Sequence, residues 1–224
     1  MSAEAAGRDG RRPRPLVPLP ARLAVLLSGR GSNFEALADA CDRGEIPARV
    51  VLVVSDVESA RGLSRARERG ISSKVIGTGA GMTRERREAE LAASLEEARP
   101  DLICLAGFMR VLSPAFVARF PFRILNVHPS VLPSFPGLHA QEQAVRYGVR
   151  VSGATVHFVD AGTDTGPIVG QTAVEVLDRD DSGALSARIL PAEHALYVSC
   201  VRRILEGGWR LDGRTVRFPD GGEV

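Results

Sequence analysis

A short apolar segment ends in two polar side chains that could act on a substrate. Asn126 and His128 are separated by one valine at the end of the run 122–128. In a β-strand, residues i and i+2 project from the same face, and Pro129 would end the strand directly afterwards. An amide can hydrogen-bond a developing oxyanion, and an imidazole can move a proton near neutral pH. The pair is a candidate centre for acyl or formyl transfer, although a turn-capping asparagine and a backbone-bonded histidine fit the same triplet.

A second stretch combines a buried strand, a glycine loop and a helix. Residues 23–28 form an apolar run typical of a parallel strand, and residues 29–33 follow directly with two glycines. Such a junction presents free backbone N–H groups to an anion. Ser32 or Asn33 would cap the helix and donate to phosphate oxygens. Because Phe34 stands where a dinucleotide fingerprint needs glycine, the loop predicts a single-phosphate site or, equally, a purely structural turn.

The remaining runs describe an α/β architecture. Two extended segments, 151–159 and 167–176, are joined by a polar turn and predict a hairpin. We therefore predict a Rossmann-like open, mostly parallel sheet flanked by helices, with an antiparallel strand pair in the C-terminal part. The last helix would be interrupted or kinked at Pro191. The other predicted strands cover residues 23–28, 50–55, 74–76, 101–106 and 122–128, and the predicted helices begin at Phe34 and Ser113 and cover residues 60–68, 83–98, 139–147 and 182–205.

Two loops at predicted strand ends, and one helix start, also carry candidate ligand contacts. The segment 107–112 leaves the carboxyl end of a predicted parallel strand, where open α/β sheets bind ligands, although apolar side chains of this kind more often belong to the core. Asp164 lies in the glycine-rich tip 160–166 of the hairpin, where an aspartate usually forms an Asx turn unless a histidine approaches it. Arg84, after the glycine-rich stretch 77–81, is the one position of a charged helix that we expect near a ligand.

Length and composition favour one domain. The 224 residues are 44% hydrophobic, enough for one domain over residues 21–208 between a disordered N-terminal extension (1–20) and a C-terminal tail (209–224) with a short hairpin near Asp212. The 29 basic and 27 acidic residues are intermixed and give a net charge of +2, which argues against a nucleic-acid or membrane-surface partner. No segment approaches the roughly 20 apolar residues of a membrane span. Three scattered cysteines and four histidines without ligand spacing predict a cytoplasmic protein with reduced thiols and no metal site.

Four segments of the chain form an ordered set of motifs. They are SGRGSN at 28–33, LAGFMRVLS at 105–113, LNVHPSVLP at 125–133 continuing into PGLH at 136–139, and GATVHFV at 153–159 with DTGP at 164–167. In this order they resemble the glycinamide ribonucleotide formyltransferases of purine biosynthesis, which use 10-formyltetrahydrofolate. The resemblance covers about residues 23–207 and leaves both tails unmatched.

The resemblance implies a role for each matching residue. Asn126, His128 and Asp164 match the family's catalytic asparagine, histidine and aspartate. The implied ligands are phosphoribosylglycinamide and the co-substrate 10-formyltetrahydrofolate, and the oligomeric state, a homodimer included, stays open. The implied ribonucleotide site comprises Gly31, Ser32, Asn33 and Glu193, and the implied folate site comprises Arg84, Met109, Arg110, Val111, Leu112 and a hairpin loop that begins at Asp160.

The implied reaction gives these groups distinct tasks. The substrate amine would attack the formyl carbon, and Asn126 with protonated His128 would stabilise the tetrahedral oxyanion. Asp164 would hold the imidazole and favour its charged form, because a nearby opposite charge raises a histidine pKa. His157 lies in an apolar strand and is expected to be a hydrogen-bonded scaffold residue.

Other functions share part of this pattern. Methionyl-tRNA formyltransferases would call for an additional basic C-terminal domain, and formyltetrahydrofolate hydrolases for an N-terminal regulatory domain, neither of which we expect here. A non-catalytic folate- or nucleotide-binding protein on a similar scaffold is the alternative from another class. The chain departs from the family pattern at Ser134, where a lysine is usual, and at Leu190, where a polar residue can occur. Substrate contacts at these two positions therefore stay open.

Overall fold

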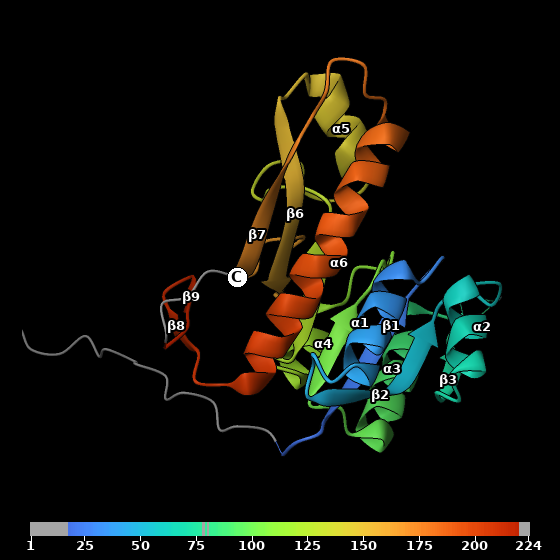
Figure 1. Cartoon of the computed structure of the whole chain (residues 1–224). Helices are drawn as coiled ribbons and strands as arrows, with labels where there is room; N and C mark the ends of the chain where they lie inside the picture. The colour runs from blue at the N-terminus through green and yellow to red at the C-terminus, as the bar shows by residue number, and fades with distance from the viewer. Residues whose placement is uncertain (1–17, 78, 80, 220–224) are drawn as a thin grey trace, which may run out of the picture.

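A seven-stranded sheet crosses the part of the chain that the computed structural model describes, residues 18–77, 79 and 81–219 (Figure 1). Its strand order is β3-β2-β1-β4-β5-β6-β7. Strands β1 to β5 run parallel, whereas β6 pairs antiparallel with both β5 and β7. The predicted fold class is therefore confirmed. The strands are β1 (Ala21–Leu27), β2 (Ala48–Ser55), β3 (Ser73–Val75), β4 (Leu102–Leu105), β5 (Ile124–His128), β6 (Val151–Phe158) and β7 (Ile168–Glu175).

The sheet reverses its direction of growth between β1 and β4. From β1 the chain adds β2 and β3 on one side, then returns to add β4 and β5 on the other. Loops that leave two parallel strands at such a reversal diverge, and ligands of open α/β sheets bind in the crevice between them. Here these loops are the glycine loop 28–33 and the segment 107–112. The first residues of these two loops are joined before the loops diverge, because the Ser28 N–H donates to the Gly107 carbonyl at 3.0 Å.

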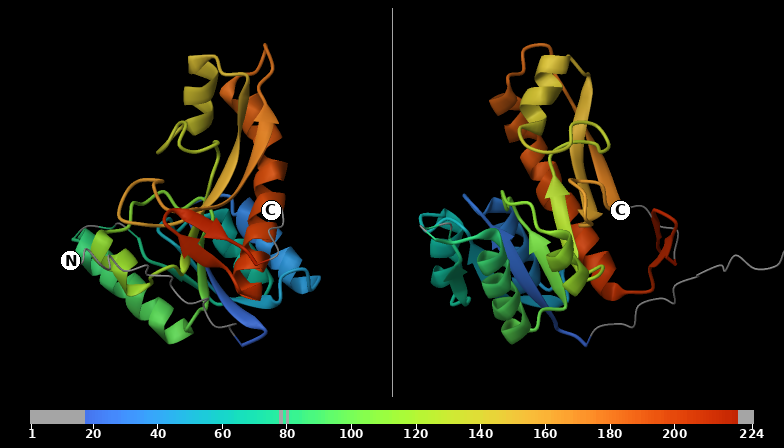
Figure 2. Two further views of the ribbon diagram at one scale, coloured as in Figure 1. Left: turned by 90° about the vertical axis from the view of Figure 1, so that its left-hand side faces the viewer. Right: turned by 180° about the vertical axis from the view of Figure 1, so that it is seen from behind.

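Alternating side chains of the strands fill two hydrophobic cores. Leu23, Val25 and Leu27 of β1 belong to the core that includes α1, α2 and α6, whereas Ala24 and Leu26 belong to the core that includes α3 and α4. Both faces of the parallel strands are therefore buried, which explains their continuous apolar runs. Figure 2 shows helices on both sides of the sheet. The helices are α1 (Ser32–Asp42), α2 (Arg61–Glu68), α3 (Arg84–Ala98), α4 (Pro114–Arg119), α5 (Ala140–Tyr147) and α6 (Ser182–Glu206).

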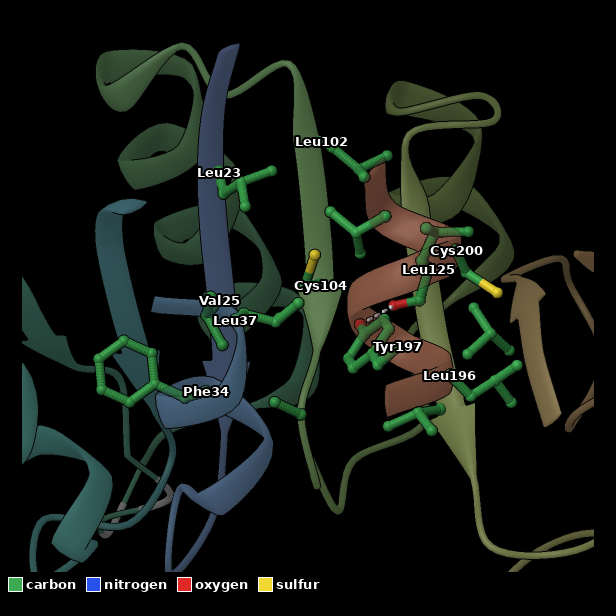
Figure 3. Packing of buried hydrophobic residues seen from close by; sticks show 14 of the residues in the cluster. Leu23, Val25, Phe34, Leu37, Leu102, Cys104, Leu125, Leu196, Tyr197 and Cys200 are labelled. Atoms are coloured by element: carbon green, nitrogen blue, oxygen red, sulfur yellow. Dashed lines mark hydrogen bonds between the residues drawn. The ribbon is translucent and has the colours of Figure 1, made fainter. Parts of the chain in front are cut away.

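Helix α6 is continuous through Pro191, so the interruption that this residue suggested is absent. Pro191 is exposed, while the opposite side of the helix packs into the core. The hydroxyl of the buried Tyr197 donates a bifurcated hydrogen bond to the carbonyl oxygens of Leu105 and Leu125, at 3.1 Å each. Figure 3 shows Tyr197 of α6 packed in this core near Leu125. Tertiary packing thus offsets the hydrogen bond that the proline removes. It also fixes α6 against β4 and β5, one residue before Asn126.

The hairpin β6–β7 extends beyond the parallel strands together with α5 and the N-terminal half of α6 (Figure 1). Near the C-terminus, β8 (Arg210–Asp212) and β9 (Thr215–Arg217) pair antiparallel, which confirms the predicted hairpin in the tail. Residues 1–17 of the predicted N-terminal extension lie outside the described residues. Among the described helices, none combines the length and the apolar character that a membrane crossing requires.

Candidate active site

A cluster of polar side chains lies at the carboxyl end of β5. Asn126 and His128 come from this strand, and β6 places His157 directly opposite Asn126 in the antiparallel ladder. His128 is 4% exposed and His157 is 2% exposed, so both imidazoles are shielded from solvent. Buried polar groups of this kind need partners within the protein. The cluster supplies them, and its centre is a carboxylate from a distant loop.

That carboxylate belongs to Asp164, whose backbone is left-handed with φ 54. Its Oδ2 accepts the Gly137 N–H at 2.7 Å and lies 3.3 Å from His128 Nδ1. Its Oδ1 lies 3.5 Å from both Asn126 Nδ2 and His157 Nε2. Asp164 therefore does not form the Asx turn that such a loop favours, and the structure brings all three predicted catalytic residues together.

Asp160 closes the same loop on itself. Its Oδ1 accepts the Gly162 N–H at 3.0 Å and the Thr165 hydroxyl at 2.7 Å. The Asx-type turn thus falls four residues before Asp164. Asp160 was predicted to contact folate. In the structure, its Oδ1 instead stabilises the loop that presents Asp164.

His157 contacts two of the predicted catalytic side chains, which the sequence alone had not suggested. Its Nδ1 donates to the carbonyl of Phe158 at 2.9 Å, so the neutral ring has a lone pair on Nε2. Asn126 Nδ2 lies 3.2 Å from that Nε2 and can donate to it. The imidazole therefore fixes the orientation of the Asn126 amide. Strand register could have predicted this contact. When β6 pairs antiparallel with β5, one residue of β6 must lie opposite Asn126.

Burial decides the protonation of His128. It lowers the pKa of His128 below the usual value, although the Asp164 carboxylate and the Phe135 carbonyl, 2.8 Å from Nε2, both act to raise it. Asp164 therefore favours the charged imidazole, as expected, but desolvation outweighs this ion pair and the net pKa of His128 is lowered. Burial by itself would raise the pKa of Asp164, but the nearby imidazoles of His157 and His128, with the hydrogen bond from the Gly137 N–H, lower it below normal. At neutral pH the cluster holds a carboxylate and a mostly neutral His128.

The glycine loop leaves its backbone donors available. Gly31 is the N-cap of α1 in a left-handed conformation, φ 80, and no side chain of the described residues caps the helix. The predicted cap by Ser32 or Asn33 is therefore wrong, because the helix starts at Ser32 itself. A Cβ at Gly31 would lie 2.7 Å from the Cα of Gly62, so only glycine fits against α2. The first N–H groups of α1 remain free for an anion.

Helix α6 carries a buried carboxyl, and a cavity lies between this helix and α1. Glu193 is 7% exposed, makes no hydrogen bond within the described residues, and has its pKa raised to about 7 by burial. The amide oxygen of Asn33 and Nε2 of His194 are likewise buried without a partner among these residues. Buried polar groups without a protein partner are candidates for contact with a substrate. A cavity of about 460 Å³ runs between α1 and α6, lined by Ser32, Glu35, Ala36, Asp39, Arg43, Glu45, His194, Ala195 and Val198.

The segment 107–112 offers a mixed surface on the other side of the crevice. Met109 and Val111 are 58% and 60% exposed, whereas Leu112 is buried in the core between the sheet and α3. Arg84 Nη2 donates to the Val111 carbonyl at 3.1 Å, so this arginine holds the segment from the α3 side. Arg110 pairs with a buried aspartate through its Nε. Two apolar side chains and part of one guanidinium thus face solvent here.

The described residues contain no group of three or more histidine, cysteine or acidic side chains placed to share a metal ion. The cysteines are free thiols. Burial raises the pKa of Cys104 and of Cys200 to about 12, and the pKa of Cys41 to about 11. At neutral pH they are protonated, apolar in behaviour and poor nucleophiles.

Comparison with known proteins agrees with this geometry. The formyl transferase family model matches residues 21–201. A phosphoribosylglycinamide formyltransferase of Mycobacterium tuberculosis is 45% identical over 196 residues, 88% of this chain and 90% of the relative. The trifunctional purine biosynthetic protein adenosine-3 of Drosophila melanogaster is 50% identical over 188 residues, and the chain spans only 14% of its length.

A solved structure supports the same assignment. The glycinamide ribonucleotide transformylase 1 of Symbiobacterium toebii has a TM-score of 0.86 and 47% sequence identity to this chain. The match covers 88% of this chain and 93% of that one. The family resemblance found in the motifs is confirmed, and the chain belongs to the formyl transferase family.

Proposed function

We propose that this chain transfers the formyl group of 10-formyltetrahydrofolate to the amine of phosphoribosylglycinamide in purine biosynthesis. The observation that carries the proposal is the Asn126, His128 and Asp164 cluster at the same sheet edge as a glycine loop with free N–H groups. The cluster can stabilise an acyl-transfer transition state, and the glycine loop can bind a phosphate. The family membership and the named relatives support the same reaction.

The reaction needs an oxyanion donor and a route for one proton. The unprotonated amine attacks the formyl carbon, a C–N bond forms, and the carbonyl oxygen becomes negative. The Asn126 amide has two N–H groups. One is held by His157 Nε2 at 3.2 Å, and the other, in a long 3.5 Å contact with Asp164 Oδ1, would turn to donate to this oxygen. The bond from carbon to the folate nitrogen then breaks. The proton lost by the attacking amine is delivered to that leaving nitrogen.

Asp164 and His128 are proposed to handle the proton. The lowered pKa of Asp164 keeps it ionised, so it can accept a proton from the attacking amine directly or through water. The lowered pKa of His128 keeps its imidazole mostly neutral, which makes it a ready acceptor as charge develops beside Asp164. Because both groups are shielded, a charge change on one is felt strongly by the other.

The ribonucleotide would lie along α1 and α6. Its phosphate would accept hydrogen bonds from the N–H groups of Gly31, Ser32 and Asn33, and the helix dipole adds to the attraction. Glu193 would receive hydroxyl or amine donors from the ligand, since the described residues give its buried carboxyl no partner. The cavity between α1 and α6 is lined in part by Ser32, so it adjoins the proposed phosphate site.

The folate would occupy the other side of the crevice. The exposed Met109 and Val111 offer apolar contact for its ring system, and Leu112 supports them from the core. Arg110 and Arg84 would meet anionic or carbonyl groups of the folate. Asp160 would act chiefly through the loop that it folds, because its Oδ1 is already bonded within that loop.

The deciding experiment offers competing acceptors to one donor. Purified protein is incubated with 10-formyltetrahydrofolate and, in separate reactions, phosphoribosylglycinamide, water alone or aminoacylated methionine tRNA. We expect formylation of the ribonucleotide to exceed the other two reactions by several orders of magnitude. Release of formate at an equal rate without an acceptor would indicate a hydrolase, and formylation of the tRNA would indicate the other transferase. Binding without turnover would indicate a carrier.

A further inference from the structure

Asp56, the residue after β2, has one of the few buried carboxylates outside the polar cluster. Its side chain is 2% exposed, although it lies at the sheet edge that carries the candidate site. Ionised carboxylates are seldom buried without specific partners, because desolvation is costly. Both oxygens of Asp56 have such a partner, and the two partners belong to different loops.

The first oxygen of Asp56 binds the start of the glycine loop. Ser28 Oγ donates to Asp56 Oδ1 at 2.5 Å. The same hydroxyl accepts the backbone N–H of Met109 at 2.9 Å, and the Ser28 N–H donates to the Gly107 carbonyl at 3.0 Å. Ser28 is therefore bonded to β2 on one side and to the loop after β4 on the other.

The second oxygen binds the segment 107–112 itself. Arg110 Nε donates to Asp56 Oδ2 at 2.6 Å, a charge-assisted hydrogen bond. The Arg110 side chain is still 41% exposed, so its remaining N–H groups can reach a ligand. Asp56 thus fixes the guanidinium at one edge and leaves the other edge open.

We propose that Asp56 is a positioning residue that couples the two substrate loops by holding Ser28 and Arg110 at once. The proposal rests on the proposed function for the identity of the two substrates. It assigns to Asp56 no contact with either of them. Because the sheet reverses between β1 and β4, the loops diverge, and the short hydrogen-bonded path Arg110–Asp56–Ser28 spans the point where they part.

Two substitutions distinguish the Asp56–Ser28 contact from the Asp56–Arg110 contact. Asp56→Ala removes both and should raise the KM for the ribonucleotide and for the folate by roughly tenfold each, with kcat changed by less than about threefold. Asp56→Asn keeps an acceptor for the Ser28 hydroxyl but loses the ion pair with Arg110. It should therefore restore the ribonucleotide KM and leave the folate KM raised.

Amide hydrogen exchange without substrate tests the same coupling independently of the reaction. In Asp56→Ala, the amides of segments 28–33 and 107–112 should exchange roughly tenfold faster, while the central strands stay protected. Asp101→Asn is the matched control, since Asp101 accepts the Arg22 N–H at 2.8 Å and joins β1 to β4 at the opposite, amino ends. It should lower stability without accelerating these loops selectively.

The outcomes distinguish the two proposals. If Asp56→Ala leaves both KM values and both loops unchanged, or affects them no more than Asp101→Asn does, Asp56 is only a stabilising residue and the inference is wrong. If the loops loosen together but the wild-type protein transfers no formyl group, the coupling stands and the proposed function fails.

Discussion

The polar cluster on β5 and the glycine loop after β1 lie at the same edge of the sheet. They differ in how far their hydrogen-bonding groups already have partners within the protein. In the cluster, Asn126, His128 and Asp164 are bonded to one another or to nearby backbone. In the loop, the first N–H groups of α1 meet no side-chain cap within the described residues. The cluster is thus oriented before any substrate binds. The N–H groups of the glycine loop, in contrast, are available to bind one.

The electrostatic settings of the two regions differ in the same way. Hydrogen bonds and charges in the cluster lower the pKa of Asp164 against the effect of burial. On α6, Glu193 has no such support among the described residues, and burial raises its pKa to about 7. The cluster therefore keeps its charge without ligand, whereas Glu193 is poised to change its ionisation when donors arrive.

The largest expected effect comes from removing the oriented amide. Asn126→Ala should lower kcat by roughly 100-fold to 1000-fold, because one preorganised oxyanion donor is worth about 3 kcal/mol. The melting temperature should change little compared with this loss. Gln141→Ala is the control, since it deletes a side-chain amide of α5 that has no hydrogen-bond partner among the described residues. Steady-state kinetics with unchanged turnover in Asn126→Ala would contradict the role of this amide.

Asp164→Asn tests the charge within the cluster. It should lower kcat by about 100-fold, as expected for loss of a general acid-base group. The carboxylate raises the pKa of His128 against burial, so its removal should move the titration of this imidazole to lower pH. NMR titration of the histidine and the pH dependence of the residual rate both report the shift. An unchanged titration would show that Asp164 and His128 are not coupled.

Gly31→Ala tests the open loop. The new Cβ would be strained by the left-handed backbone and would press on the Gly62 Cα, so the first turn of α1 must move. The KM for the ribonucleotide should rise roughly tenfold or more, with a smaller effect on the folate KM. Gly44→Ala has a similar φ of 73 but nothing within 4 Å of the new Cβ. If both variants behave alike, backbone strain rather than contact at the loop is responsible.

The smallest expected effect concerns stability. The folded pKa of Glu193 lies above its usual value of 4.5, so the folded state disfavours ionisation. This contribution to stability is fully present below about pH 4.5 and is lost as pH rises through about 7. Glu193→Gln avoids that loss and should melt at a higher temperature than the wild type at about pH 8, but not at about pH 4. It should also bind the ribonucleotide several-fold more weakly. A constant difference in melting temperature across pH would contradict the raised pKa.

Local sequence patterns were sufficient for the framework of the fold. The apolar runs around Val25 and Cys104 predicted buried parallel strands because both faces of such strands are covered. Thr83 predicted the start of α3, and its hydroxyl accepts the Arg86 N–H at 3.3 Å. Asn126 and His128 were predicted to share a face because the strand period is two. All three inferences depend on a few consecutive residues, where the chain's own geometry decides.

Contacts between distant segments explain what the local patterns missed. Pro191 suggested a break in the last helix, but core packing and Tyr197 hold α6 together. Ser32 was expected to cap α1, yet contact with Gly62 of α2 places Gly31 at that position. His157 was expected to be a hydrogen-bonded scaffold residue, but its partner was not predicted, and the register across β5 and β6 places it opposite Asn126. A partner from another element decided each outcome.

By itself the sequence determined the residue types at the site, the strand and helix periods, and the motif order that places the chain in its family. Only the tertiary structure decided that Asp164 reaches the β5 cluster, that Asp56 joins two loops, and that burial lowers the pKa of His128. The physical reason is that hydrogen bonds between distant segments, and the exclusion of solvent from a side chain, depend on how those segments pack. Periodicity and turn formation depend only on residues close in the sequence.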